Sequence, residues 1–218
     1  MIQFDEYLEL ALLFIFFYKN LIGVLKLGKK KILMDAEKRW LSIDGPEFIA
    51  KIGISAGHTV VDFGCGDGFQ IGLLDVPHYT GLDVSPAALE LCRTRFADRA
   101  GWRFLPAADR AAWAGRYDMA MSLDVIFHLV ETEVFEAYMH DLFAHADRLV
   151  LIYSSDVDHD APGRHVLHRN VTRWTAENLP HWRQTRAIPN PFGREIDQPH
   201  DRRTSVARFM VYEPAARA

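Results

Sequence analysis

The chain turns sharply within VVDFGCGDG, residues 60–68, where a short apolar run meets three glycines. The apolar residues suit a parallel strand that is covered on both faces. Gly64, Gly66 and Gly68 remove side chains where a backbone must approach a ligand. Because ligands of open α/β sheets bind at the carboxyl ends of the strands, this turn predicts a site for a nucleotide-like ligand.

A second acidic residue follows at a suitable distance. Asp83 ends the next apolar strand, residues 79–83, nineteen residues after Gly64. This is close to the spacing expected for a carboxylate that binds ribose hydroxyls. A dinucleotide-binding turn would place its third glycine at position 69, but Phe69 is there. The pattern therefore indicates a nucleoside-containing ligand other than NAD.

Asp62 followed by Gly-x-Gly-x-Gly resembles the first motif of the class I S-adenosylmethionine (SAM)-dependent methyltransferases. The resemblance spans residues 58–212, with its specific motifs confined to 60–68 and 79–83. It implies that Asp62 and the glycine turn hold the methionine part of SAM, that Asp83 receives the ribose hydroxyls, and that Asp109 contacts adenine. The cofactor-binding residues that it implies are Asp62, Gly64, Cys65, Gly66, Gly68, Asp83, Val84, Asp109 and Leu123.

Each of the three carboxylates also has a purely structural interpretation. Asp62 would cap a turn, Asp83 would cap the next helix, and Asp109 would be a solvated loop charge. Cys65 is interpreted as a small apolar filler of the turn rather than a reactive thiol. The two cysteines of the chain, Cys65 and Cys92, have no metal-ligand or disulfide-framework spacing, which favours a reducing cytoplasm.

The pattern of elements predicts one α/β domain. Strands are expected at 58–63, 79–83, 102–105, 117–123 and 148–154, and helices from about 68, at 86–97 and at 132–145. A short helix near 172–179 and strands at 182–188 and 205–212 follow, and the resemblance implies that these strands form an antiparallel hairpin. The predicted fold is a Rossmann-like doubly wound sheet, mostly parallel, with N-terminal helices. Residues 58–218 would form the methyltransferase domain and residues 1–57 a helical segment.

The N-terminal segment carries an apolar run, Leu10–Tyr18, that resumes after Lys19 and precedes three lysines at 29–31. A membrane-spanning helix needs about 20 mostly apolar residues, and a charge near its centre costs about 2.5–3.5 kcal/mol, so Lys19 counts against a span. Three interpretations stay open: a helix packed on the domain or on a sister subunit, a helix on an anionic membrane surface, and an anchor. Residues 8–31 are thus the predicted contact of a homodimer or of a peripheral membrane association.

Chemistry is expected at the carboxyl ends of the fourth and fifth strands. His128 is the first candidate for a general base, because a neutral imidazole accepts a hydroxyl proton near pH 7. Asp124 would orient it or close the cofactor pocket. The alternative for His128 is a partly buried histidine that bonds to backbone. Tyr153 follows the fifth strand as a candidate acceptor-binding residue.

The stretch Asp156–Asp160, with the histidines that follow it, contains many potential metal ligands but matches no rigid ligand template, so no metal site is predicted. His165, His168 and Arg169 are instead predicted to recognise an anionic or sugar-like acceptor, because Arg169 can make a bidentate contact to a carboxylate or phosphate.

The predicted function is methylation of a small molecule, with transfer to oxygen favoured over nitrogen or carbon. A net charge of −4 and the lack of an evident basic patch argue against a nucleic-acid partner. Two alternatives remain: a protein or nucleic-acid methyltransferase, and a noncatalytic subunit that docks through its N-terminal helix.

Overall fold

The computed structural model describes residues 57–68, 71, 76–160, 166–188, 196 and 206–215. The predicted N-terminal helices, Phe69, His165 and the proline-rich connection that begins at Pro189 lie outside the described residues, as does most of the helix expected from about residue 68. Within the described part, no helix is long and apolar enough to cross a membrane.

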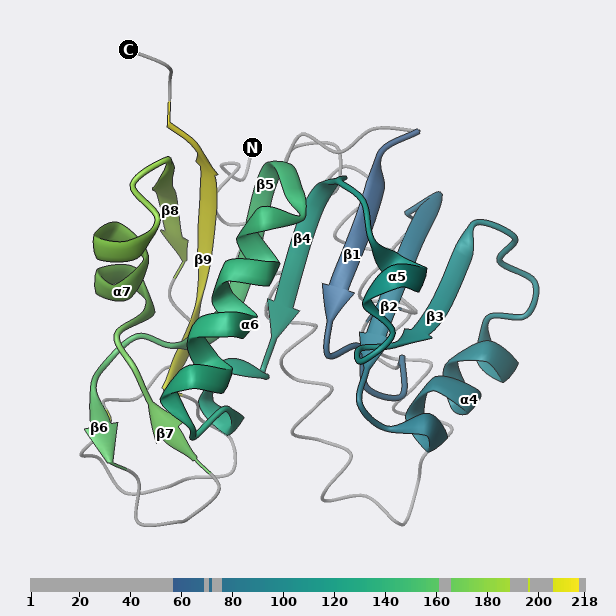
Figure 1. The fold of residues 1–218 in the computed structure, drawn as a ribbon, viewed down its shortest axis with the longest axis horizontal. Helices are drawn as coiled ribbons and strands as arrows, with labels where there is room; N and C mark the ends of the chain where they lie inside the picture. Colours follow the sequence, from purple (N-terminus) through teal and green to yellow (C-terminus); the bar gives the residue numbers. More distant parts are fainter. Residues whose placement is uncertain are drawn as a thin grey trace, which may run out of the picture.

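A seven-stranded sheet forms the centre of the domain (Figure 1). Its strands are β1 (Thr59–Phe63), β2 (His78–Asp83), β3 (Trp102–Pro106), β4 (Tyr117–Leu123), β5 (Ala146–Ser155), β8 (Trp182–Ile188) and β9 (Ala207–Pro214). They are ordered β3-β2-β1-β4-β5-β9-β8. The first five are parallel, whereas β9 is antiparallel to both β5 and β8. The predicted mostly parallel sheet with an antiparallel C-terminal hairpin is therefore confirmed.

The helices are α4 (Pro86–Arg95), α5 (Arg110–Trp113), α6 (Thr132–Ala144) and α7 (Val171–Asn178), with a 3₁₀ turn η2 (Ile126–His128). A separate small hairpin pairs β6 (His159–Asp160) with β7 (Leu167–His168). The sequence did not predict α5, η2 or this hairpin, because each is too short to show a hydrophobic period. The predicted start of α4 is confirmed: Pro86 is its first residue, and the Ser85 hydroxyl accepts the Ala88 N–H at 3.3 Å.

Alternation along the strands builds a hydrophobic layer on each face of the sheet. Val60 joins the cluster that contains Leu89 and Cys92 of α4. Its neighbour Val61 joins the opposite cluster, with Phe135 of α6. The predicted packing of α4 and α6 onto the sheet is thus confirmed.

The strand order reverses between β1 and β4, whose carboxyl ends lie at the same edge of the sheet (Figure 1). A crevice at such a switch point is where doubly wound sheets bind their ligands. The fold therefore places the glycine turn after β1 beside the loop after β4.

Buried tyrosines predict how stability depends on alkaline pH. Burial raises the pKa of Tyr212 to about 12 and raises those of Tyr79 and Tyr138 further above 10. The folded protein therefore keeps protons that the unfolded chain releases above pH 10, and the free energy of unfolding should fall as pH rises from about 10. Each tyrosine adds a slope of up to about 1.4 kcal/mol per pH unit. Urea denaturation between pH 8 and 11 measures this slope, and Tyr212→Phe should reduce it; an unchanged slope would contradict the prediction.

Candidate functional site

The glycine turn is tied to the end of β2 by backbone hydrogen bonds. The N–H groups of Gly64 and Cys65 both donate to the carbonyl oxygen of Leu82, at 2.8 and 2.9 Å. The N–H of Gly66 donates to Asp83 Oδ2 at 2.9 Å. The two predicted motifs therefore form one unit at the crevice.

The three glycines of the turn serve different purposes. A Cβ at Gly64, where φ is +90°, would lie 2.4 Å from Val125 Cγ2. A Cβ at Gly68 would lie 2.6 Å from Phe96 Cε2. At Gly66, where φ is +58°, it would meet no atom of the described residues within 4 Å. Packing within the protein therefore requires Gly64 and Gly68, whereas the described residues leave room at Gly66 for a ligand to approach.

Asp62 lies inside β1 with 2% of its surface exposed, and its Oδ2 accepts a hydrogen bond from the Tyr79 hydroxyl at 2.7 Å. Burial, followed by the charge of Asp62, raises the pKa of Tyr79 well above 10, so the phenol keeps the proton that it donates. Sequence reasoning missed Tyr79. Only the parallel register, in which Tyr79 stands opposite Val60, places its side chain on the same face as Asp62.

The Asp83 carboxylate caps the segment that leads into α4 and also positions the glycine turn. Its Oδ1 accepts the Ser85 N–H at 2.8 Å, and its Oδ2 accepts the Gly66 N–H. Each carboxylate oxygen has two lone pairs, so this arrangement also suits a ribose diol. Beside it, Val84 is 89% exposed, and an apolar side chain at this edge suits a nucleoside ring.

Asp109 is the N-cap of α5 and accepts the Ala112 N–H at 3.3 Å. This geometry supports its structural interpretation, and its contact with adenine stays a prediction. Leu123 and Cys65 are mostly buried, at 4% and 8% exposure. They would therefore form the floor of the crevice rather than its rim.

The loop after β4 has an unusual backbone. Asp124 has φ +60° and is the only residue other than glycine with a positive φ in the described part of the chain. Its N–H donates to the carbonyl oxygen of Tyr153 at 2.9 Å. Non-glycine residues held in this conformation cluster at functional sites. The strain therefore agrees with the predicted role of Asp124, which remains a prediction.

Two of the predicted histidines flank Phe127. The Phe127 ring centroid lies 4.6 Å from that of His128 and 6.2 Å from that of His168. A hydrogen bond of 2.7 Å joins His168 Nδ1 to the hydroxyl of Ser155, which is 1% exposed at the end of β5. The small hairpin thus brings an oriented imidazole next to η2, and sequence reasoning missed the serine that orients it.

Two predicted acceptor-binding residues have structural partners. Tyr153 is 3% exposed and packs on Phe209, with ring centroids 4.3 Å apart. The Arg169 guanidinium donates to the carbonyl oxygens of Leu129 and Val130 and lies 4.4 Å from the Phe135 ring. Burial lowers the pKa of this guanidinium. The structure thus gives Arg169 a positioning role, and acceptor contacts of Tyr153 and Arg169 stay predictions.

The acidic stretch after β5 holds the start of α7. Asp156 accepts the Thr172 N–H at 2.8 Å, and Asp158 accepts the Asn170 N–H at 3.0 Å. Asp158 also pairs with Arg173 at 2.6 Å. Among the described residues, no cluster of three His, Cys, Asp or Glu side chains could hold a metal ion.

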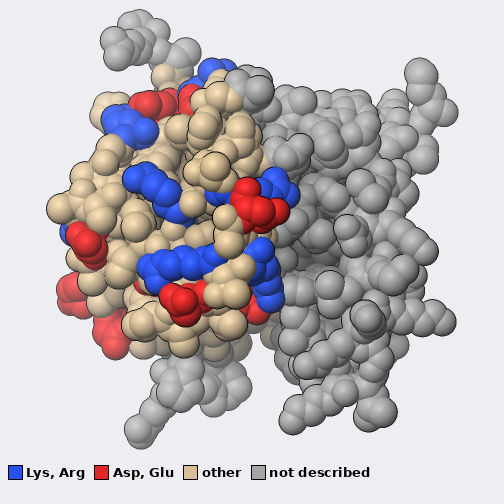
Figure 2. Space-filling model, turned by 90° about the vertical axis from the view of Figure 1, so that its right-hand side faces the viewer, with Lys and Arg blue, Asp and Glu red and all other residues tan. Residues whose placement is uncertain are grey.

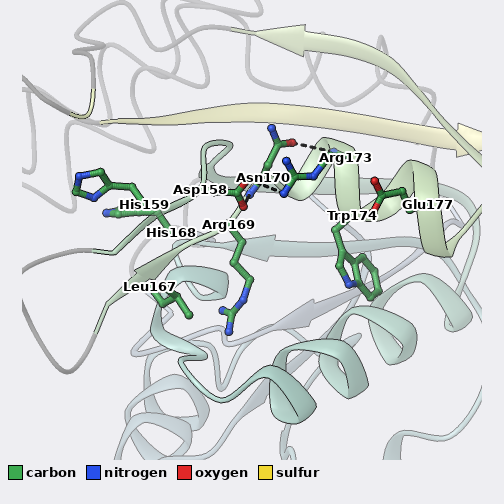
Figure 3. A pocket seen from close by; sticks show the side chains of 9 residues that line it. All are labelled: Asp158, His159, Leu167, His168, Arg169, Asn170, Arg173, Trp174 and Glu177. Carbon is green, nitrogen blue, oxygen red and sulfur yellow. Dashed lines mark hydrogen bonds and ion pairs between the residues drawn. The ribbon is translucent and has the colours of Figure 1, made fainter.

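A hollow of about 400 Å³ lies between the small hairpin and α7 (Figure 3). It is lined by Asp158, His159, Leu167, His168, Arg169, Asn170, Arg173, Trp174 and Glu177. Arg173 and Asp158 face each other across one side of it, whereas the Arg169 side chain extends away from them (Figure 3). Of the predicted site residues that the structure describes, only His168 and Arg169 border this hollow.

Residues 60–147 match the model of a methyltransferase domain family. Solved structures share the fold at low identity. The methyltransferase domain of a bacterial Hen1 protein is 19% identical, with a TM-score of 0.59 over 83% of this chain and 98% of that one. Magnesium protoporphyrin IX methyltransferase from Synechocystis PCC 6803, solved with bound S-adenosylhomocysteine (SAH), is 18% identical, with a TM-score of 0.60 over 91% and 93%.

The N-methyltransferase NodS from Bradyrhizobium japonicum WM9 has a TM-score of 0.57 at 14% identity, over 86% of this chain and 99% of that one. At these identities the likeness concerns the fold. The domain match covers β1 through the start of β5, which includes the glycine turn and Asp83. The matched domain, the strand order and the glycine turn all agree, and residues 60–147 form a methyltransferase domain with the fold of the class I SAM-dependent methyltransferases.

Proposed function

We propose that the protein transfers a methyl group from SAM to a hydroxyl oxygen of a small-molecule acceptor. Asp62, the glycine turn and Asp83 would hold the cofactor, which supplies an electrophilic methyl group on a sulfonium when bound. The protein then has to orient the acceptor oxygen in line and remove its proton.

The observation that carries the proposal is the pair of imidazoles on either side of Phe127. His128 lies on the loop that also holds Asp124, and His168 is oriented by the buried Ser155 hydroxyl. A neutral imidazole is the side chain best suited to accept a hydroxyl proton near pH 7. Oxygen acceptors need such a base because a protonated hydroxyl is a weak nucleophile.

Surface charge supports a small acceptor over a nucleic acid. On the face that carries α4 and β3, basic and acidic side chains are interspersed (Figure 2). Arginines there are engaged with the protein: Arg93 donates to the Phe104 carbonyl at 2.8 Å, and Arg103 donates to the Thr80 hydroxyl at 3.1 Å. Recognition of a phosphate backbone would favour a continuous basic stripe instead.

A methyl-transfer screen tests the proposed acceptor class. The full chain is incubated with methyl-labelled SAM and fractionated extracts of small metabolites, proteins and nucleic acids, with and without EDTA. We expect label in an alkali-stable methyl ether of the small-molecule fraction. Label confined to protein or nucleic acid would contradict the proposal, as would label on nitrogen alone.

Once an acceptor is found, variants can show which of the two histidines is the general base. Replacement of the base by glutamine should lower kcat about 10²–10⁴-fold and leave the affinity for SAH unchanged. His128→Gln and His168→Gln are compared by kcat against pH. His78→Gln is the matched control, because His78 is exposed at the start of β2, opposite the crevice. If both variants keep the wild-type pH profile, neither histidine is the base.

A further inference from the structure

Both cysteines of the chain lie beneath the cofactor turn and bond to one atom of it. The Cys92 thiol donates to the carbonyl oxygen of Gly66 at 3.3 Å, and the Cys65 thiol approaches the same oxygen at 3.7 Å. Both residues are buried, at 0% and 8% exposure. Because Asp83 binds the N–H of Gly66 from the other side, this one residue is held at both its amide and its carbonyl group.

The sulfurs fill the space around the turn closely. A Cβ at Gly68 would lie 2.8 Å from Cys92 Sγ, and a Cβ at Gly81 would lie 2.9 Å from Cys65 Sγ. The interaction between the two side chains lowers the pKa of Cys92 and raises that of Cys65. Both sulfurs therefore lie within 3.7 Å of one carbonyl oxygen and pack tightly against the turn and β2.

We propose that Cys65 and Cys92 form a redox pair that controls cofactor binding: as thiols they hold the Gly66 carbonyl in place, and as a disulfide they release it and weaken the affinity for SAM and SAH. The pair is distinct from the methyl-transfer chemistry and does not depend on the identity of the acceptor.

The oxidation balances with a hydroperoxide as the two-electron oxidant. Two S–H bonds and the O–O bond break, one S–S bond forms, and with hydrogen peroxide the two protons and two electrons leave in two molecules of water. A disulfide requires an S–S distance of about 2.05 Å and a Cβ–Cβ distance of about 3.5–4.5 Å. Both thiol donors to the Gly66 carbonyl are then lost, and the glycine turn is drawn toward α4.

The chain suits a clean test because it contains two cysteines in all. An intramolecular disulfide therefore has to join Cys65 to Cys92, and a non-reducing gel separates it from intermolecular products. The full chain, free of cofactor, is treated with hydrogen peroxide, and intact mass spectrometry follows the loss of two hydrogens. Calorimetry then measures the Kd for SAH before oxidation, after oxidation and after dithiothreitol.

We expect the Kd for SAH to rise at least tenfold on oxidation and to recover on reduction. Cys65→Ala and Cys92→Ala each prevent the disulfide, so the tenfold rise in Kd should be absent from both variants. Any smaller effect of methionine oxidation should be equal in the variants and in the wild type. Three results would overturn the proposal: no loss of two hydrogens, a disulfide with unchanged SAH affinity, or equal loss of affinity in the single-cysteine variants.

The coupling between SAH binding and the redox state of the cysteine pair gives a second test. If the disulfide weakens SAH binding, saturating SAH must favour the dithiol by the same factor. In glutathione redox buffers the reduction potential of the pair should rise by about 30 mV for each tenfold difference in SAH affinity. A reduction potential that does not change when SAH is added would overturn the proposal. If the reduced wild type failed to bind SAH, the cofactor assignment itself would be wrong, which separates that failure from failure of the redox pair.

Discussion

Replacing Gly64 with alanine should lower the free energy of unfolding by about 3 kcal/mol. The new Cβ would lie 2.4 Å from Val125 Cγ2, and the backbone has φ +90°, which L side chains rarely adopt. Overpacking costs about 1–3 kcal/mol, and a strained backbone position costs about as much again. Urea denaturation of the variant and the wild type measures the difference.

Gly66→Ala is the matched control for this variant, because its position in the same turn has a positive φ but no described atom within 4 Å of the added Cβ. Its stability loss should stay near 1 kcal/mol, the cost of a left-handed conformation. Its Kd for SAH should rise at least tenfold, because the methyl group enters the side from which the ligand approaches. In the Gly64→Ala background, Val125→Ala should restore the steric part of the lost stability. Equal stability losses at the two glycines would show that the turn is not packed as described.

The parts of the fold that the sequence predicted are those encoded locally. Continuous apolar runs predicted the parallel strands, and Ser85 with Pro86 predicted the start of α4, because caps and hydrophobic periods depend only on neighbouring residues. The glycine turn and Asp83 were predicted for the same reason. The structure adds that they are bonded to each other through the Gly66 N–H.

The parts that the sequence did not predict depend on register and on partners distant in sequence. Tyr79 meets Asp62, and Cys92 meets Gly66, only after the strands and α4 have docked. Arg169 also has partners that the sequence did not reveal. Its chemistry predicted an anionic acceptor, which stays a prediction, and the fold also places carbonyl oxygens and an aromatic ring around it. A side chain's donors do not reveal which acceptors the fold will bring to it.

Replacing Asp83 with alanine should raise the Kd for SAH roughly 100-fold, the value of two hydrogen bonds from ribose hydroxyls to a charged acceptor. The same substitution also removes the acceptors of the Gly66 and Ser85 N–H groups, so the unfolding free energy should fall by about 1–3 kcal/mol. Loss of affinity alone would therefore not separate a ribose contact from a disturbed turn.

A thermodynamic cycle that varies both the Asp83 side chain and the ligand separates a ribose contact from a disturbed turn. SAH and its 2′-deoxy analogue are titrated by calorimetry into the wild type and into Asp83→Asn, which keeps the size of the side chain but loses its charge. If Asp83 binds the ribose, removal of the 2′-hydroxyl should cost the wild type about tenfold in affinity and cost the variant much less. Asp109→Asn is the control, because Asp109 caps α5 and is expected near adenine, so the full tenfold cost should persist. An equal cost in the wild type and Asp83→Asn would leave Asp83 as a structural cap of the turn and of α4.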